Sequence, residues 1–153
     1  MRLQRISLAI FSSTAVEAFS GQGGLYGKAR WNTKGRLIVY AAEHTSLAMA
    51  EALVHIQRSN NIEPYNRYEI EVPDALINKA PPPPVGWEKS YALTQPIGDA
   101  WLAGRSSVGL LVPSAIVANE FNCLLNPAHP AFNLGWVVSG PHPFLFDSRL
   151  TRP

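Results

Sequence analysis

Prolines interrupt this chain at so many connections that they restrict the folds open to it. There are 13 prolines among 153 residues, and four of them stand together at positions 81–84. Proline lacks the backbone N–H that a helix needs, so we expect a polyproline II loop on the surface there. Asn126-Pro127 and His129-Pro130 predict further turns. Such connections disfavour a regular βαβ succession, and we predict an α+β fold: one domain over residues 1–153, with a mixed, largely antiparallel sheet and few helices.

Apolar periodicity places the elements of this fold. Residues 36–42 are apolar on both faces of an expected strand, which predicts a central position in the sheet. Directly after it, Thr45 and Ser46 offer N-cap hydroxyls to a helix over residues 47–59, which Asn60 and Asn61 would end. Further strands are expected at residues 3–11, 68–72, 108–112, 136–139 and 143–146.

The composition is that of a folded protein from a reducing compartment. Hydrophobic residues make up 46% of the chain and charged residues 16%, which is too apolar for disorder. A net charge of +2 without a basic run predicts no direct contact with nucleic acid. Cys123 has no partner for an internal disulfide and is expected to be buried. Polar residues at 12–14 interrupt the N-terminal apolar run, so we interpret it as a strand rather than an export signal and expect a cytoplasmic protein without a membrane span.

Two polar side chains are expected at the border of the core. Glu51 lies on the predicted helix among apolar neighbours three and four residues away, which is an unusual place for a carboxylate. It is either a ligand-binding group or a boundary glutamate that reaches water. Tyr40 points from the predicted central strand, where its hydroxyl needs a hydrogen-bond partner and a core role is the alternative.

Two further polar residues adjoin expected turns and strand ends. Arg30 follows a glycine cluster at 20–24, and its planar guanidinium is suited to a pyrophosphate; an exposed strand-edge arginine is the alternative. Ser114 follows the strand expected at 108–112, but no G-x-S-x-G elbow surrounds it, so a turn or cap role competes with a role in a site. The four histidines and Cys123 show no metal-ligand spacing, and no metal site is predicted.

Several short motifs follow one another in order along nearly the whole chain. They are Gly23-Gly24, Arg30-Trp31-Asn32, Val39-Tyr40-Ala41, Glu51, Val112-Pro113-Ser114-Ala115, Asn126-Pro127-x-His129-Pro130 and Phe146-Asp147-x-Arg149. In this order and spacing the chain resembles the RES domain family. The arginine, glutamate and serine that give the family its name correspond to Arg30, Glu51 and Ser114.

The resemblance has implications for fold, activity and partners. It implies the toxin of a type II toxin–antitoxin module, with an ADP-ribosyltransferase-like fold and an activity that consumes NAD as substrate, without a further cofactor. It also implies an antitoxin of the Xre type, with a helix-turn-helix part, that covers the active site. A homodimer within the toxin–antitoxin complex is expected as well.

Roles for individual residues follow from the resemblance and from the chemistry of the side chains. Glu51 would bind the nicotinamide ribose and stabilise positive charge at its anomeric carbon. Arg30 would hold the pyrophosphate, Tyr40 would lie near the nicotinamide ring, and Ser114 would donate a hydrogen bond to ribose or carboxamide. Further contacts with NAD are expected from Gly24, Trp31, Asn32 and Asn126.

Four functions are compatible with these residues to different degrees. The first is NAD degradation, in which water or phosphate accepts the ribose. The second is ADP-ribosyl transfer to a specific protein, which would use the same site. A noncatalytic antitoxin-binding protein would not need four matching polar positions, and a nuclease would need a basic patch that the sequence lacks.

Overall fold

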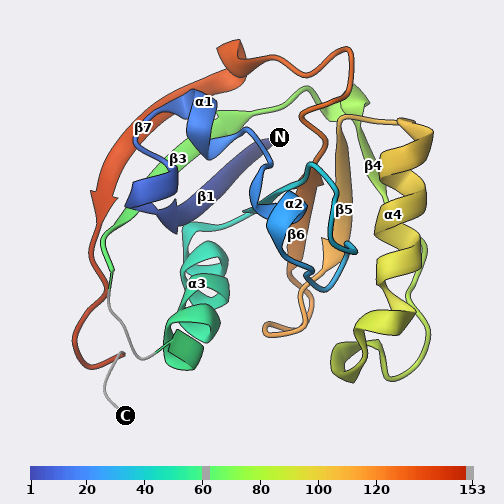
Figure 1. Cartoon of the computed structure of the whole chain (residues 1–153), viewed down its shortest axis with the longest axis horizontal. Coiled ribbons are helices and arrows are strands. Elements are labelled where there is room, and N and C mark those ends of the chain that lie inside the picture. Colours follow the sequence, from blue (N-terminus) through green and yellow to red (C-terminus); the bar gives the residue numbers. More distant parts are fainter. Residues whose placement is uncertain (60–62, 151–153) are drawn as a thin grey trace.

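The computed structural model describes residues 1–59 and 63–150. A sheet of seven strands forms the centre of this part of the chain. The strands lie in the order β4-β5-β6-β2-β1-β3-β7 (Figure 1). Their bounds are Arg2–Leu8 (β1), Val39–Ala42 (β2), Tyr65–Glu71 (β3), Ile77–Lys79 (β4), Gly109–Pro113 (β5), Phe121–Leu125 (β6) and Val137–Phe144 (β7). Neighbours are antiparallel except β4 and β5, which are parallel. The predicted α+β fold with a largely antiparallel mixed sheet is thus confirmed.

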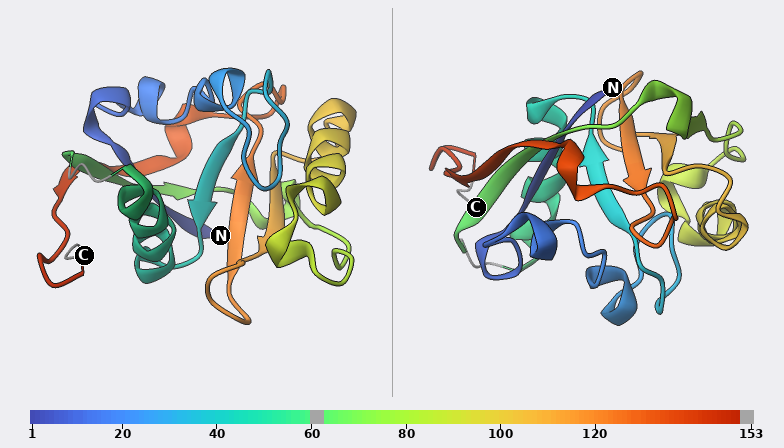
Figure 2. Two further views of the ribbon diagram at one scale, coloured as in Figure 1. Left: turned by 60° about the horizontal axis from the view of Figure 1, so that its bottom comes forward. Right: turned by 90° about the horizontal axis from the view of Figure 1, so that it is seen from above.

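The described helices cover both faces of this sheet. They are α1 (Ala15–Ala18), α2 (Gly23–Tyr26), α3 (Thr45–Ser59) and α4 (Gln95–Gly104), with 3-10 turns at Ala9–Phe11, Asp74–Leu76, Trp87–Lys89, Tyr91–Leu93 and Leu134–Trp136. Figure 2 shows α1 and α2 on the opposite side of the sheet from α3. The helix predicted after residue 46 already begins at Thr45, and its predicted end at residues 60–61 lies outside the described residues. No helix of the described residues is long and apolar enough to span a membrane.

The alternation of side chains along β2 explains its central position. Val39 and Ala41 belong to a core cluster with residues of β1, β3 and α1. Tyr40 points to the other face, where it packs against a second cluster that includes α4. Because both faces are covered, the predicted central strand is confirmed, although its ladder begins only at residue 39.

Two expected strand boundaries were wrong. The first strand ends at Leu8 because Ser12 folds back on it: the Ser12 hydroxyl donates to the Leu8 carbonyl at 2.7 Å, and a 3-10 turn replaces the expected strand over residues 9–11. The segments predicted separately at 136–139 and 143–146 instead belong mainly to the single strand β7. This strand tolerates Pro141 and Pro143 because it lies at the edge of the sheet, where one side of the backbone needs no ladder partner.

The thiol of Cys123 provides a test of core packing. Its side chain is fully buried on β6, and burial raises the pKa of the thiol to about 12 from an ordinary value of 9.0. Since the thiolate is the reactive form, we expect no measurable labelling of the folded protein by a thiol reagent at pH 8, and rapid labelling in urea. The folded state binds this proton more tightly, so its contribution to stability is present below pH 9 and is lost as the pH rises towards 12. Fast labelling without urea would contradict this packing.

Candidate active site

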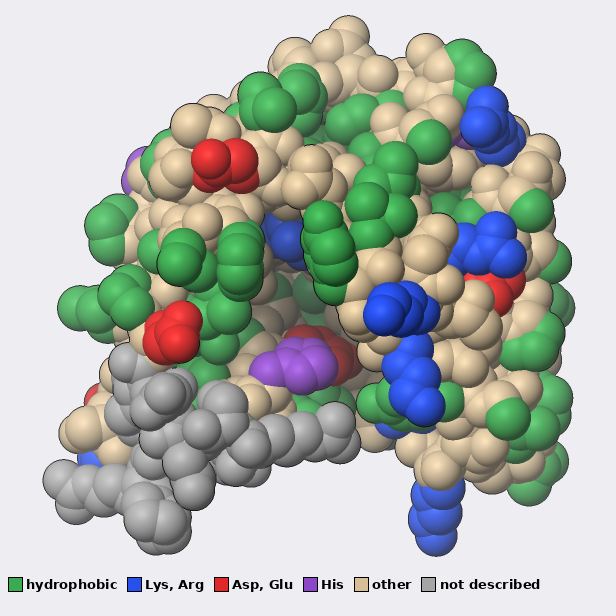
Figure 3. All heavy atoms as spheres, viewed as in Figure 1, with side chains coloured by type: hydrophobic (Ala, Val, Ile, Leu, Met, Phe, Trp, Pro, Cys, Tyr) green, Lys and Arg blue, Asp and Glu red, His purple; other side chains and the backbone are tan. Residues whose placement is uncertain are grey.

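A cavity of about 600 Å³ lies between α3, the segment that follows α2, and the strands β1, β2 and β6. This volume is typical of sites for small molecules. It is lined by Gln4, Arg5, Ile6, Lys28, Ala29, Arg30, Trp31, Tyr40, Ala41, Ala42, Ala48, Glu51, Ala52, Val54, His55, Tyr91, Pro113, Ala115, Ile116 and Asn122. The space-filling view shows the surface hollowed beside α3, with histidine, acidic and basic side chains at the recess (Figure 3). Three cationic residues and one carboxylate contribute to the lining, so the cavity favours an anionic ligand.

Glu51 is held in place from two other elements of the fold. Ser114 Oγ, just after β5, donates to Glu51 Oε1 at 3.1 Å, and Asn122 Nδ2, on β6, donates to the same oxygen at 2.6 Å. The antiparallel register places Val112 of β5 beside Asn122, which brings these two donors together. Both hydrogen bonds that the described residues make to this carboxylate go to Oε1, so Oε2 is the oxygen that they leave for a ligand. The carboxylate that was predicted to bind a ligand is thus held in one orientation by two hydrogen bonds.

Ser114 stabilises a turn and also contacts the Glu51 carboxylate. Its hydroxyl oxygen accepts hydrogen bonds from the backbone N–H groups of Ile116 and Val117, each at 3.1 Å. It therefore stabilises the turn after β5, as Ser and Thr hydroxyls commonly do. At the same time it donates to Glu51, and only 8% of its surface is exposed. This arrangement makes Ser114 a support for the carboxylate rather than a nucleophile.

Tyr40 connects β2 to the segment that carries Arg30. The Tyr40 hydroxyl accepts a hydrogen bond from the Trp31 N–H at 3.2 Å and donates one to Asn32 Oδ1 at 2.7 Å. The expected partner of the buried phenol is therefore found. Burial raises the pKa of Tyr40 well above its ordinary value, so the phenol stays neutral at physiological pH.

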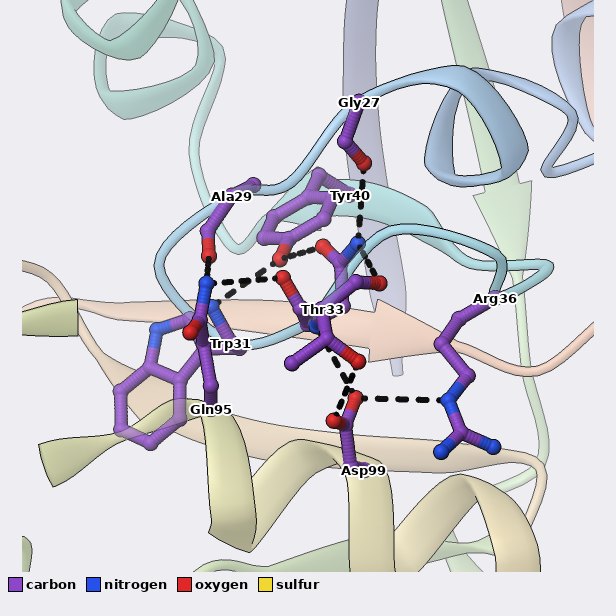
Figure 4. Close-up of polar contacts among 9 residues, drawn as sticks. Gly27, Ala29, Trp31, Thr33, Arg36, Tyr40, Gln95 and Asp99 are labelled. Carbon is purple, nitrogen blue, oxygen red and sulfur yellow. Dashed lines mark hydrogen bonds and ion pairs between the residues drawn. The ribbon is translucent and has the colours of Figure 1, made fainter. Parts of the chain in front are cut away.

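Helix α4 holds the same segment from the other side (Figure 4). Gln95 Nε2 donates to the carbonyls of Ala29 and Asn32 at 2.9 and 3.1 Å. Asp99 accepts hydrogen bonds from the Thr33 N–H at 3.1 Å and from the Thr33 hydroxyl at 2.6 Å. Residues 29–33 are thus fixed between β2 and α4, and so is the backbone of Arg30.

The guanidinium of Arg30 is also held by the chain before α4. Its Nη1 donates to the Trp87 carbonyl at 3.0 Å. The group lies 5.6 Å from the centre of the Trp87 ring and 5.0 Å from that of Tyr91, which are cation–π distances. Arg30 is therefore not a loose surface arginine, and aromatic contacts orient it at the wall of the cavity.

Four residues predicted to contact NAD are not among those that line the cavity: Ser114, described above, and Gly24, Asn32 and Asn126. Gly24 packs so closely that a Cβ there would lie 2.1 Å from the Arg36 carbonyl oxygen. Asn32 is buried and holds Tyr40. Asn126 follows β6 at the end remote from Asn122, and its side chain accepts a hydrogen bond from the Ala128 N–H at 3.0 Å. Each has a structural contact, while its contact with NAD stays a prediction.

Sequence reasoning missed two polar residues of the site. Asn122 contacts the Glu51 carboxylate directly, and the signal for it was a single amide in the apolar run over 121–125. Arg5 lines the cavity from β1, but an arginine in a strand pattern gives no sign that it lies beside a ligand site.

Tyr40→Phe tests the bridge between β2 and residues 31–32. We expect a loss of about 1–3 kcal/mol in the free energy of unfolding, because the backbone N–H of Trp31 and the side-chain Oδ1 of Asn32, both in buried residues, lose their partner. Urea unfolding measures this loss. Tyr26→Phe is the matched control, since Tyr26 is 77% exposed and its change should stay within about 0.5 kcal/mol. Equal stability of the two variants would contradict the bridge.

Comparisons with known proteins identify the family of this chain. The model of the RES domain matches residues 2–147. The chain is 39% identical to "Toxin Res" of Yersinia enterocolitica, over 98% of this chain and 99% of that protein. It is also 39% identical to "Prs ADP-ribosylating toxin" of a Sphingobium species, over 87% of this chain and 86% of that protein.

A solved structure shows the same fold. It is the M. tuberculosis MbcT-MbcA toxin-antitoxin complex, with a TM-score of 0.67, 17% identity, and coverage of 89% of this chain and 79% of that one. At this identity the likeness concerns the fold alone. The family model and the relatives together show that the chain belongs to the RES domain family, whose relatives found here are named as toxins.

Proposed function

We propose that this protein is the toxin of a toxin–antitoxin pair and that it cleaves the bond between nicotinamide and ribose in NAD, which is its substrate. The observation that carries the proposal is the Glu51 carboxylate, held by Ser114 and Asn122 in a cavity that is otherwise cationic. A carboxylate that keeps one oxygen for a ligand is suited to a sugar whose anomeric carbon becomes positive.

The chemistry needs little more than this carboxylate. When the bond between the anomeric carbon and the ring nitrogen breaks, its electron pair goes to nicotinamide, which leaves as a neutral molecule without a general acid. The ribose passes through an oxocarbenium-like state, which Glu51 stabilises electrostatically. An acceptor oxygen then bonds to the anomeric carbon. Water loses a proton to solvent in this step, whereas phosphate attacks through an oxygen that is already deprotonated.

The other lining residues bind and orient the dinucleotide. Arg30, held by Trp87 and Tyr91, presents its remaining N–H groups to the pyrophosphate. Tyr40 and Trp31 are both lining residues. The half-buried Tyr40 ring would supply apolar surface for the nicotinamide, while the Trp31 side chain is 2% exposed and packs against Trp87. NAD is the substrate in this scheme, and the chain's own residues perform the reaction without a further cofactor.

ADP-ribosyl transfer to a protein is the second candidate function. It is favoured by the name of the Sphingobium relative, an ADP-ribosylating toxin. The same carboxylate and the same cleavage would serve it, with a protein side chain as acceptor. For either activity we propose action in the cytoplasm, and an Xre-like antitoxin that covers the cavity and binds the toxin as a homodimer. The structural similarity to a toxin from a toxin–antitoxin complex supports a partner of this kind.

Incubation of the purified protein with NAD tests the proposal. We expect multiple-turnover release of nicotinamide, which chromatography measures. If this release requires added phosphate, phosphate is the acceptor. Release only in the presence of cell lysate, together with modification of a protein by ADP-ribose, would support the transferase instead. No release under any of these conditions would overturn both.

A further inference from the structure

Arg5 is a cationic residue of the cavity to which the reaction scheme gives no role. It lies on β1, next to Gln4. In the described ladder Gln4 pairs with Ala42, and this is the only residue pair there that joins β1 to β2. On the Arg5 side of this pair the two strands separate. The Arg5 guanidinium takes the place of the ladder there, since its Nη1 donates to the Tyr40 carbonyl at 2.8 Å. The cavity reaches this opening between the strands.

The charge of Arg5 is not compensated in the described part of the chain. The bond to the Tyr40 carbonyl is the only hydrogen bond its side chain makes there, and its Nε is buried without a partner. No carboxylate of the described residues forms an ion pair with it. Burial lowers the pKa of Arg5 to about 10, so the group is still charged at neutral pH. A cation that is desolvated without a counter-ion is costly, and an anionic ligand would offset that cost.

We propose that Arg5 binds a phosphate oxygen of the ligand from β1, as a second guanidinium beside Arg30. The identity of the ligand rests on the proposed function. The bond to Tyr40 uses Nη1, and Nε is buried, so Nη2 is the guanidinium nitrogen left to donate a charge-assisted hydrogen bond to phosphate. The phosphate is either the pyrophosphate of NAD or a free phosphate that accepts the ribose.

Calorimetric binding of ADP-ribose in phosphate-free buffer tests the first source. We expect Arg5→Gln to weaken binding about tenfold or more, because a charge-assisted hydrogen bond is lost. The matched control is Arg2→Gln on the same strand, since Arg2 is exposed and pairs with Glu69 and Glu71 away from the cavity. Its affinity for ADP-ribose should equal that of the wild type.

Inorganic phosphate is the probe for the second source. If Arg5 holds free phosphate, Arg5→Gln will abolish phosphate binding and the phosphate-dependent part of NAD turnover, while its affinity for ADP-ribose stays unchanged. Unchanged affinity of Arg5→Gln for both probes would overturn the proposal, and nicotinamide release by the wild type would still support the proposed function. Conversely, the protein could bind ADP-ribose or phosphate through Arg5 and yet release no nicotinamide from NAD. That result would support the phosphate site and overturn NAD cleavage.

A purely structural role for Arg5 has a different signature. If the side chain only joined β1 to Tyr40, its removal would lower stability but would not change how binding depends on salt. We expect the slope of ADP-ribose or phosphate affinity against ionic strength to become shallower in Arg5→Gln. If that variant does not fold, Arg5→Lys decides: it keeps the charge but not the planar guanidinium, which can donate to the Tyr40 carbonyl and to a phosphate from different nitrogens. A severalfold loss of affinity supports the proposal and wild-type affinity contradicts it.

Discussion

Glu51→Gln should lower the rate of nicotinamide release by about 10²-fold or more, with a much smaller effect on the affinity for NAD. The substitution keeps the size of the side chain and an oxygen that can accept from Ser114 and Asn122. It removes the negative charge that would stabilise the developing cation, so the loss falls on the transition state. Steady-state assays of nicotinamide release measure kcat and KM separately.

A matched control separates this effect from a general loss of charge. Glu71→Gln changes an exposed carboxylate on β3 that pairs with Arg2, outside the cavity, and should leave kcat and KM at wild-type values. A Glu51→Gln variant with full turnover would remove the carboxylate from the mechanism. If Glu51→Gln and Glu71→Gln lost activity alike, a global effect of charge would be responsible.

Gly98→Ala should displace α4 from the segment that carries Arg30. In a helix interior alanine is ordinarily the better residue by about 1 kcal/mol. Here, however, a Cβ at position 98 would lie 1.8 Å from the Trp31 carbonyl oxygen, and backbone has to move to avoid that contact. We expect a loss of about 1–3 kcal/mol or more in the free energy of unfolding, and a raised KM for NAD because Arg30 shifts with the segment. Urea unfolding and the kinetic assay measure these two effects.

The same helix offers the control for this substitution. Gly104, the last residue of α4, has open space where a Cβ would stand. Gly104→Ala should therefore be neutral or stabilising by up to about 1 kcal/mol, with an unchanged KM. A stabilising Gly98→Ala would show that the close approach of α4 to Trp31 is not a constraint on the fold.

Local sequence patterns predicted the helix and strands that bury a regular apolar face. The central strand and the helix that carries Glu51 follow from apolar periodicity, because both bury apolar faces. The alternation at 68–72 likewise predicted most of a strand, in which Tyr68 and Ile70 are buried. β4 was missed because it has three residues, and its parallel pairing with β5 depends on a distant segment.

The site was predictable only in part for a related reason. Glu51 and Ser114 were singled out individually, but their hydrogen bond joins residues 63 positions apart and depends on the β5–β6 register. Asn122 depends on the same register, and sequence spacing carries no trace of it. The place of Arg5 beside the cavity depends on the separation of β1 and β2 after one residue pair. This is a tertiary feature of the sheet that the sequence does not indicate.

A crystal structure of the Glu51→Gln variant with NAD would show whether the cavity beside Glu51 is an NAD site. The variant is suited to this because it should bind the substrate without consuming it. We expect the nicotinamide ribose against residue 51, with the pyrophosphate within hydrogen-bond distance of a guanidinium of Arg30 or Arg5. NAD bound elsewhere on the protein, with this cavity filled only by solvent, would rule out an NAD site at Glu51.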